Sequence, residues 1–132
     1  MILVLLGTQN NSFVRLLKAI QKNIDKKVIT DEVVVQAGFT KFDSKDMKIF
    51  GLIDKKKLSK LQDKADLIIT SYMINELKEA SKEKVINDIL QAFNKLAIFI
   101  EPGTPEGFNN IRKVQSLALE SNLNIIAPCT CQ

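Results

Sequence analysis

The chain has 132 residues, of which 45% are hydrophobic and 26% are charged, and its formal net charge is +4 at pH 7. This length and this balance are typical of one globular domain with its own core, and they exclude a disordered chain. No apolar run approaches the roughly 20 residues that a membrane-spanning helix needs, so we expect no membrane span.

The positive charge is concentrated in the first half of the chain. Residues 1–70 carry 13 Lys/Arg against 8 Asp/Glu, whereas residues 71–132 carry 6 against 7. A basic half is compatible with nucleic acid or an anionic surface. However, the lysines are scattered and aromatic residues do not alternate with them, which favours solvated helix faces. We therefore predict no nucleic-acid partner.

The first half of the chain reads as alternating strands and helices. Ile2–Leu6 is an unbroken apolar run closed by Gly7, which is typical of a central parallel strand buried on both faces. Asn11 or Ser12 is the expected cap of a helix with apolar positions at helical spacing. The further expected elements are strands Glu32–Gln36 and Lys48–Leu52 and a helix Asp54–Ala65, whose lysine-rich start we expect to fray.

The second half continues the same alternation. Asp66–Thr70 is the next predicted strand, and helical spacing follows from Ser71 to Phe93, with Ser81 as a candidate cap of a second helix. Leu96–Ile100 is a further strand. Thr104 followed by Pro105 is a cap and first-turn signature of a helix. Asn124–Ala127 is the last predicted strand.

Repeated strand–helix units predict an α/β fold with a parallel sheet, right-handed crossovers and helices on both faces. We expect one Rossmann-like domain over residues 1–132, in three layers (α/β/α), with strand order 3-2-1-4-5-6. Ligands of such sheets bind beyond the carboxyl ends of the strands. Those ends are expected at Gly7–Gln9, Gln36–Thr40, Ser71–Met73 and Glu101–Thr104.

Two motifs in residues 1–70 point to one enzyme family. The Gly7-Thr8-Gln9 turn and the segment Gln36-Ala37-Gly38-Phe39-Thr40-Lys41 together resemble the Alg13/PssE glycosyltransferase family, which corresponds to the donor-binding C-terminal domain of GT-B enzymes. The resemblance implies a uridine diphosphate sugar as donor and a membrane-anchored partner subunit. It also implies nucleotide-sugar contacts by Gly7, Thr8, Gln9, Gly38 and Lys41. The family's His-Gly-Gly turn is replaced by Ser71-Tyr72-Met73, and the chain contains no histidine.

Residues 66–131 carry motifs of a different family. The strings Asp66–Leu77, Ile100–Phe108 (Ile-Glu-Pro-Gly-Thr-Pro-Glu-Gly-Phe) and Ile126–Cys129 resemble the C-terminal part of the Rsm22 family, methyltransferase-like proteins associated with the small ribosomal subunit. The family's strand and Gly-x-Gly turn for S-adenosylmethionine are missing, and residues 1–65 occupy their place. Its metal-binding cysteines are also incomplete here.

The two resemblances meet at Thr70/Ser71, within a strand that either family would place fourth in the sheet. We therefore predict a chimera of two Rossmann-like half-domains, engineered or natural, with no native catalytic function and no cofactor. The first alternative is a UDP-sugar-binding glycosyltransferase subunit. A further alternative is an S-adenosylmethionine-dependent or ribosome-associated module, against which the missing cofactor-binding half argues.

Several side chains remain open as site residues. The Gly7-Thr8-Gln9 turn could offer N–H groups to a diphosphate or could be a plain tight turn. Lys41 and Arg15 more simply extend into solvent. Glu76, after the fourth strand, and Glu101, after the fifth, could do acid–base chemistry. A structural role fits each of them better.

Cys129 and Cys131 are the two cysteines of the chain. A zinc or iron–sulfur site wants four ligands, so we predict no metal, and no feature argues for an oxidising compartment. The expected location is cytoplasmic. A homodimer through an exposed outer strand stays open.

Overall fold

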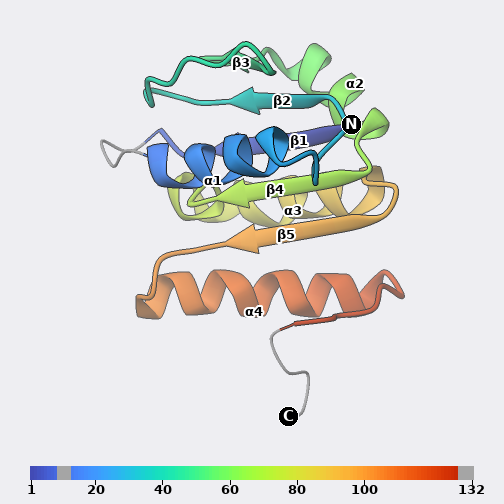
Figure 1. The fold of residues 1–132 in the computed structure, drawn as a ribbon. Helices are drawn as coiled ribbons and strands as arrows, with labels where there is room; N and C mark the ends of the chain where they lie inside the picture. The colour runs from blue at the N-terminus through green and yellow to red at the C-terminus, as the bar shows by residue number, and fades with distance from the viewer. Residues whose placement is uncertain (9–12, 128–132) are drawn as a thin grey trace.

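The computed structural model describes residues 1–8 and 13–127 and shows a five-stranded, all-parallel sheet (Figure 1). The strand order is β3-β2-β1-β4-β5, as predicted for these five strands. The elements are β1 (Ile2–Leu6), α1 (Val14–Asp25), β2 (Val33–Gln36), β3 (Met47–Phe50), α2 (Lys55–Lys64), β4 (Leu67–Ser71), the 3-10 turn η1 (Ile74–Glu76), α3 (Glu79–Ala92), β5 (Leu96–Ile100) and α4 (Pro105–Glu120).

β1 lies at the centre of the sheet because it is apolar at every position. All five of its residues are buried, and it pairs in parallel with β2 on one side and with β4 on the other. Ile2 is level with Val33 and Leu67 in this register. The carboxyl ends of β1 and β4 therefore lie side by side. Successive strands are added on one side of β1 up to β3 and on its other side from β4 onward.

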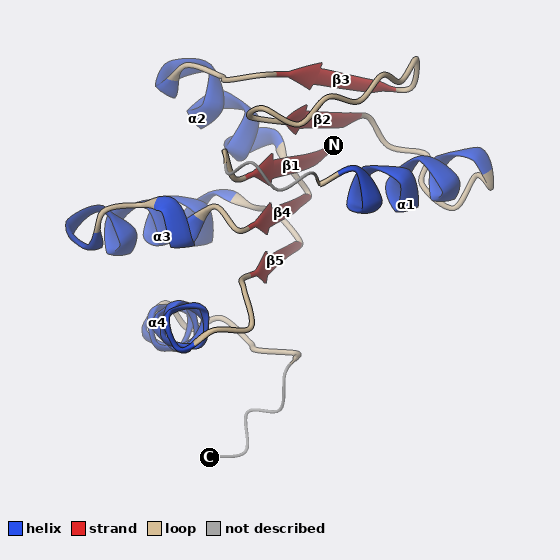
Figure 2. Cartoon of the chain, turned by 90° about the vertical axis from the view of Figure 1, so that its left-hand side faces the viewer, coloured by secondary structure: helices blue, strands red, loops and turns tan. Residues whose placement is uncertain are grey.

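The helices form a layer on each face of the sheet, but the two layers are unequal. Figure 2 shows α1 on one face and α2, α3 and α4 on the other. Right-handed crossovers explain this arrangement, since the chain moves one way from β1 to β2 and the opposite way from β4 to β5. α1 packs on one core cluster, centred on Val4, Leu6 and Leu17. Two clusters fill the opposite side, around Leu5 and Ile68 and around Ile86 and Val114.

The prediction of a sixth strand was wrong for the described part of the chain. Asn124–Ala127 runs beside α4 without pairing, and the sheet ends at β5. Leu123 and Ile125 instead pack against the cluster formed by α3 and α4. A β-branched run becomes a strand only when a neighbouring edge completes its hydrogen bonds, and Asn124–Ala127 pairs with no strand of the sheet.

Helix starts differ from the sequence prediction in two places. The Asp54 carboxylate accepts from the Lys57 backbone N–H at 2.9 Å, so α2 has a capped start, and this cap opposes the fraying that we expect from its lysines. Ser81 lies inside α3, which begins at Glu79. The proposed caps Asn11 and Ser12 lie outside the described residues. Within residues 1–8 and 13–127, no helix is long and apolar enough to cross a bilayer.

Candidate functional site at the carboxyl edge of the sheet

The turn after β1 is closed by a carboxylate from the neighbouring strand connection. Glu76 ends η1, the short turn that follows β4. Its Oε2 accepts from the Thr8 backbone N–H at 2.7 Å and from the Thr8 hydroxyl at 3.0 Å. Hydrogen bonds to a carboxylate are stronger than those between neutral groups. The two bonds from Thr8 to Glu76 therefore hold the connections after β1 and β4 together.

Gly7 is required because these two connections approach so closely. A Cβ atom at this position would lie 2.9 Å from the Tyr72 carbonyl oxygen and 3.0 Å from Glu76 Oε1. Gly38, after β2, meets the same turn from the other side. Its φ is +58°, and a Cβ there would lie 2.9 Å from the Gly7 carbonyl oxygen. Both glycines are therefore explained by backbone packing.

The residues expected to contact a nucleotide sugar are only partly brought together. Gly7, Thr8 and Gly38 lie side by side at the carboxyl edge. Lys41 is exposed to solvent on the following loop, and Gln9 lies outside the described residues. Since the Glu76 carboxylate already occupies the Thr8 amide, a diphosphate arriving here would meet a negative charge in place of a free donor.

Beside this turn lies a cavity of about 760 Å³ between the ends of β4 and β5. Its lining comes from Tyr72 and Asn75 on one side and from residues 102–106 on the other. Tyr72, which lies in the wall of this cavity, has a left-handed backbone conformation (φ +59°). Its ring packs edge-on against Phe13 at 5.6 Å between centroids, which anchors the strained residue to α1.

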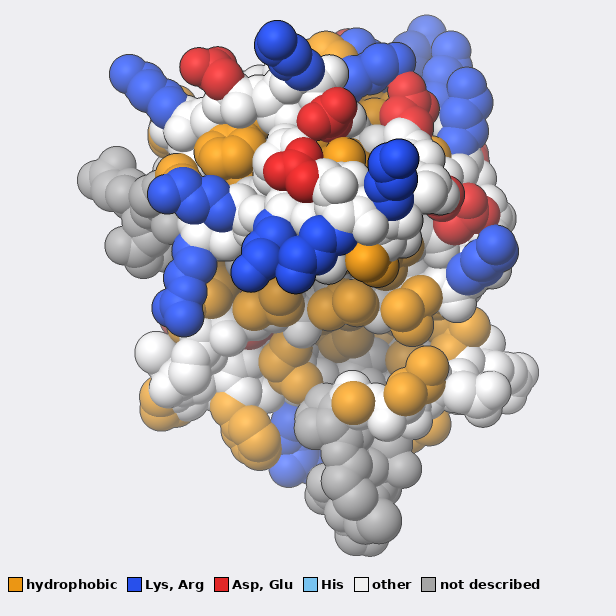
Figure 3. Space-filling model, viewed as in Figure 1, with side chains coloured by type: hydrophobic (Ala, Val, Ile, Leu, Met, Phe, Trp, Pro, Cys, Tyr) orange, Lys and Arg blue, Asp and Glu red, His pale blue; other side chains and the backbone are white. Residues whose placement is uncertain are grey.

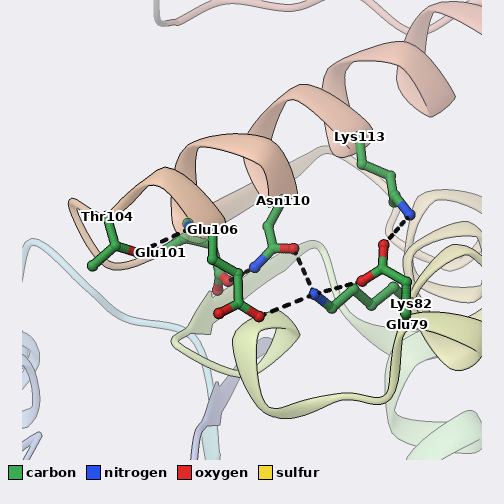
Figure 4. Close-up of polar contacts among 8 residues, drawn as sticks. Glu79, Lys82, Glu101, Thr104, Glu106, Asn110 and Lys113 are labelled. Carbon is green, nitrogen blue, oxygen red and sulfur yellow. Dashed lines mark hydrogen bonds and ion pairs between the residues drawn. The ribbon is translucent and has the colours of Figure 1, made fainter.

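Glu101 follows β5 directly, precedes Pro102 of the cavity lining, and is tied to α4. Its Oε1 accepts from Asn110 Nδ2 at 3.0 Å (Figure 4). Burial raises the pKa of Glu101, while Asn110 and the backbone N–H groups of Asn75 and Ile74 oppose that rise by favouring the carboxylate. The other oxygen, Oε2, is buried without a hydrogen-bond partner among the described residues, so Glu101 is held to α4 through Oε1.

Lys82 extends the same network into α3. The side chain is 3% exposed and donates to Asn110 Oδ1 at 2.9 Å. Its ammonium also lies 3.0 Å from Glu79 Oε2 and 3.6 Å from Glu106 Oε1. The carboxylates of Glu79 and Glu106 approach it from α3 and α4, as Figure 4 shows. Polar contacts therefore run from Lys82 on α3 through Asn110 on α4 to Glu101 at the end of β5.

Sequence reasoning missed Lys82 and Asn110, although their positions carried a signal. Lys82 occupies the buried stripe of α3 with Ile86 and Ile89, and Asn110 occupies that of α4 with Val114. A polar residue at a core-facing helical position needs a buried partner. The pattern indicates such a need, but the partner's identity depends on how the helices pack.

The arrangement offers polar contacts but no assembled metal centre. Asn75 Oδ1 and Glu76 Oε1 are buried oxygens without a hydrogen-bond partner among the described residues. Over those same residues, no group of three or more His, Cys, Asp or Glu side chains is placed to hold a metal ion. Cys129 and Cys131 lie outside them. Glu76 and Glu101 are both engaged in holding the edge of the sheet, and their acid–base role stays an untested hypothesis.

Residues 12–132 match the model of the family described as mitochondrial small ribosomal subunit Rsm22. No curated protein and no solved structure matches the chain significantly. The family match crosses Thr70/Ser71 without a break and includes most of the half that resembled glycosyltransferases. It gives no support to a separate Alg13/PssE segment. Since the match covers far more than half of the sequence, the chain belongs to the Rsm22 family.

Proposed function

We propose that this chain is a non-catalytic, methyltransferase-like member of the Rsm22 family that binds the small ribosomal subunit. The family description names that subunit and supports the choice of partner. The observation that carries the non-catalytic part is the Glu76 carboxylate on the Thr8 backbone N–H. This internal carboxylate takes the donor that the first turn of a Rossmann-like sheet otherwise offers to a ligand.

The end of β2 supports the same conclusion. In dinucleotide-binding sheets, an acidic residue in this region holds ribose hydroxyls. Here the last residue of β2 is Gln36, and its Oε1 accepts from the Ile53 backbone N–H at 3.0 Å. Two positions that commonly hold a nucleotide are thus used for internal contacts. A ligand must break them before it can bind.

The two-parent origin predicted from the sequence stays a proposal beside this one. It also implies a fold without catalysis, and β4, which contains Thr70 and Ser71, pairs in unbroken register with both neighbours. The two proposals differ in their partner, because a chimera selected only for folding has no reason to bind a ribosomal subunit.

The test combines ligand-dependent melting with subunit binding. The chain is melted alone and with saturating S-adenosylmethionine, UDP or UDP-N-acetylglucosamine, and it is co-sedimented with purified mitochondrial small ribosomal subunits. A ligand at about 100 times its Kd raises stability by about 2.7 kcal/mol, a shift of several degrees for a domain of this size. We expect no shift with any ligand and stoichiometric co-sedimentation.

Each other outcome has a distinct meaning. A shift with the uridine ligands would favour the glycosyltransferase alternative, which the family match does not support. A shift with S-adenosylmethionine would overturn the non-catalytic proposal. A ligand-insensitive melt without co-sedimentation would favour the two-parent origin and would overturn ribosome binding.

A further inference from the structure

Two apolar side chains extend into solvent at the carboxyl edge of the sheet. Phe39, in the loop after β2, is 71% exposed, and Leu52, in the loop after β3, is 69% exposed. The Gly38 N–H donates to the Gly51 carbonyl at 2.8 Å, so the two loops are joined directly before these side chains. Phe39 and Leu52 therefore form a pair of exposed apolar tips on neighbouring loops.

Lysines flank the apolar tips on both loops. Lys41 lies two residues after Phe39. Lys55 and Lys56 begin α2, three and four residues after Leu52. All three lysines are exposed, and none of them forms an ion pair with a residue that the structure describes. Their charges are therefore available to a partner outside the chain.

The first turn of α2 is held beside the end of β3. The Lys57 ammonium lies 4.1 Å from the centre of the ring of Phe50, the last residue of β3. The Asp54 carboxylate is occupied as the helix cap. Three consecutive lysines at this end of a helix oppose its dipole, so the stability of α2 does not explain them. An anionic surface next to this turn would relieve that repulsion.

The wider surroundings of the apolar tips are also basic. Residues 39–57 carry six lysines and three aspartates, and of these lysines Lys48 is paired with Glu32 at 2.7 Å. Figure 3 shows Lys and Arg side chains gathered on the upper half of the face drawn, where α1, β2 and β3 lie. Exposed apolar side chains within a positive surface are typical of proteins that lie on anionic bilayers.

We propose that the apolar tips and the lysines around them bind the surface of an anionic phospholipid bilayer. Phe39 and Leu52 insert at the boundary between the headgroups and the acyl chains. Lys41, Lys55 and Lys56 lie against the negative headgroups. The chain thus rests on the bilayer through the loops after β2 and β3. This inference is independent of the ribosomal partner proposed above.

A bilayer fits this surface better than RNA or a protein. Single-stranded RNA is bound by aromatic rings on which its bases stack. Leu52, one of the two apolar tips, has no such ring, whereas the acyl boundary accepts aliphatic and aromatic side chains alike. A stable protein interface buries about 800 Å² on each partner around an apolar centre, and two separate tips do not provide one.

The first test is flotation of the full chain with lipid vesicles. One set of vesicles is phosphatidylcholine with about 30% phosphatidylserine, and the other is phosphatidylcholine alone. We expect the chain to bind the anionic vesicles at least about tenfold more strongly than the neutral ones. Because salt screens exposed charges, about 0.5 M salt should remove most of this difference.

Paired variants separate the apolar contribution from the charge. Phe39→Ser combined with Leu52→Ser should weaken binding at least about tenfold, whereas Phe108→Ser, at a 61% exposed position on α4, should not. Lys55→Gln combined with Lys56→Gln should weaken it about 25-fold, or about fivefold for each lysine. The matched control is Lys18→Gln combined with Lys22→Gln, since both lysines are exposed on α1, on the opposite face of the sheet. It should change binding by less than about threefold.

Tryptophan fluorescence reports insertion directly, because the chain has no tryptophan of its own. On addition of the anionic vesicles, the emission of Phe39→Trp should shift to shorter wavelength and be quenched by brominated lipid, while that of Phe108→Trp should not change. Absence of binding at about 1 mM lipid, equal losses in the two lysine pairs, or unchanged emission of Phe39→Trp overturns the proposal. Binding of a uridine oligonucleotide in place of vesicles, weakened by Phe39→Ser but not by Leu52→Ser, overturns it in favour of RNA.

Discussion

Gly107 is the residue at which a single methyl group has the largest expected effect. It lies in the first turn of α4, where its N–H donates to the Thr104 hydroxyl at 3.0 Å. A Cβ atom here would lie 1.9 Å from the Pro102 carbonyl oxygen, a backbone atom that cannot rotate away. The first turn of α4 and the loop before it therefore pack so closely that no side chain fits at position 107.

We expect Gly107→Ala to lower the free energy of unfolding by at least about 1–3 kcal/mol, the usual cost of overpacking. The measurement is a urea unfolding midpoint. Gly103→Ala is the matched control, because nothing lies within 4 Å of a Cβ built at that position. Equal midpoints for the two variants would contradict this packing.

Glu101 makes a prediction about pH. Burial raises the pKa of its carboxyl above the unfolded value, so between the two values the folded chain binds more protons than the unfolded one. The contribution of this group to stability is complete below about pH 4.3 and is lost as pH rises through the folded pKa. Relative to Glu101→Gln, the wild-type chain should lose stability over that window in chemical unfolding at a series of pH values. A difference in unfolding free energy between the wild type and Glu101→Gln that does not change with pH would contradict the raised pKa of Glu101.

At the scale of elements, one side chain joins the connections after β1 and β4. Glu76→Ala removes the two hydrogen bonds that Thr8 donates to the Glu76 carboxylate. A hydrogen bond to a charged acceptor contributes about 1.5–3 kcal/mol. Partial replacement by water should reduce the loss to about 1–3 kcal/mol in thermal unfolding. Glu83→Ala, an exposed position on α3, is the control and should change stability by less than about 0.5 kcal/mol. Similar losses of stability in both variants would contradict a stabilising contact between Glu76 and Thr8.

The packing of α3 against α4 depends on the buried ammonium of Lys82. Lys82→Met should destabilise the chain by about 1–3 kcal/mol, mainly because Asn110 Oδ1 loses its donor inside the protein. Glu79 and Glu106 are 73% and 63% exposed and remain hydrated, which limits the loss. Adding Asn110→Leu removes the orphaned acceptor. A double mutant that loses the full sum of the single losses would show that the two side chains act independently.

At the scale of the whole molecule, protection from hydrogen exchange should follow the order of the sheet. β1 is buried throughout and has a strand on each side, while β3 and β5 are edge strands. Amides of β1 should exchange most slowly, through global unfolding, and those of the edges faster, through local opening. Native-state exchange monitored by NMR gives the comparison. Slower exchange in β5 than in β1 of the isolated chain would contradict a free outer edge.

The prediction of the fold succeeded where a local pattern was sufficient. Ile2–Leu6 and Leu96–Ile100 were predicted as strands at their observed bounds, and Thr104 with Pro105 marked the start of α4. It failed at Asn124–Ala127, where the composition of a strand is present but its partner is not. Gly7, Thr8 and Gly38, which we predicted as site residues, lie together at the carboxyl edge of the sheet, where Glu76 holds the Thr8 backbone N–H. Their role in binding a ligand stays a prediction.

The sequence by itself determined the alternation of strands and helices, the parallel sheet and the central place of β1, because hydrophobic periodicity and capping act over a few residues. Tertiary structure decided which polar groups meet. Glu76 and Thr8 are 68 positions apart, and Lys82 and Asn110 are 28 apart. Their contacts depend on crossover handedness and helix packing, which bring distant residues to one edge. Only the assembled sheet also shows that β5 ends it, with no described strand on its outer side.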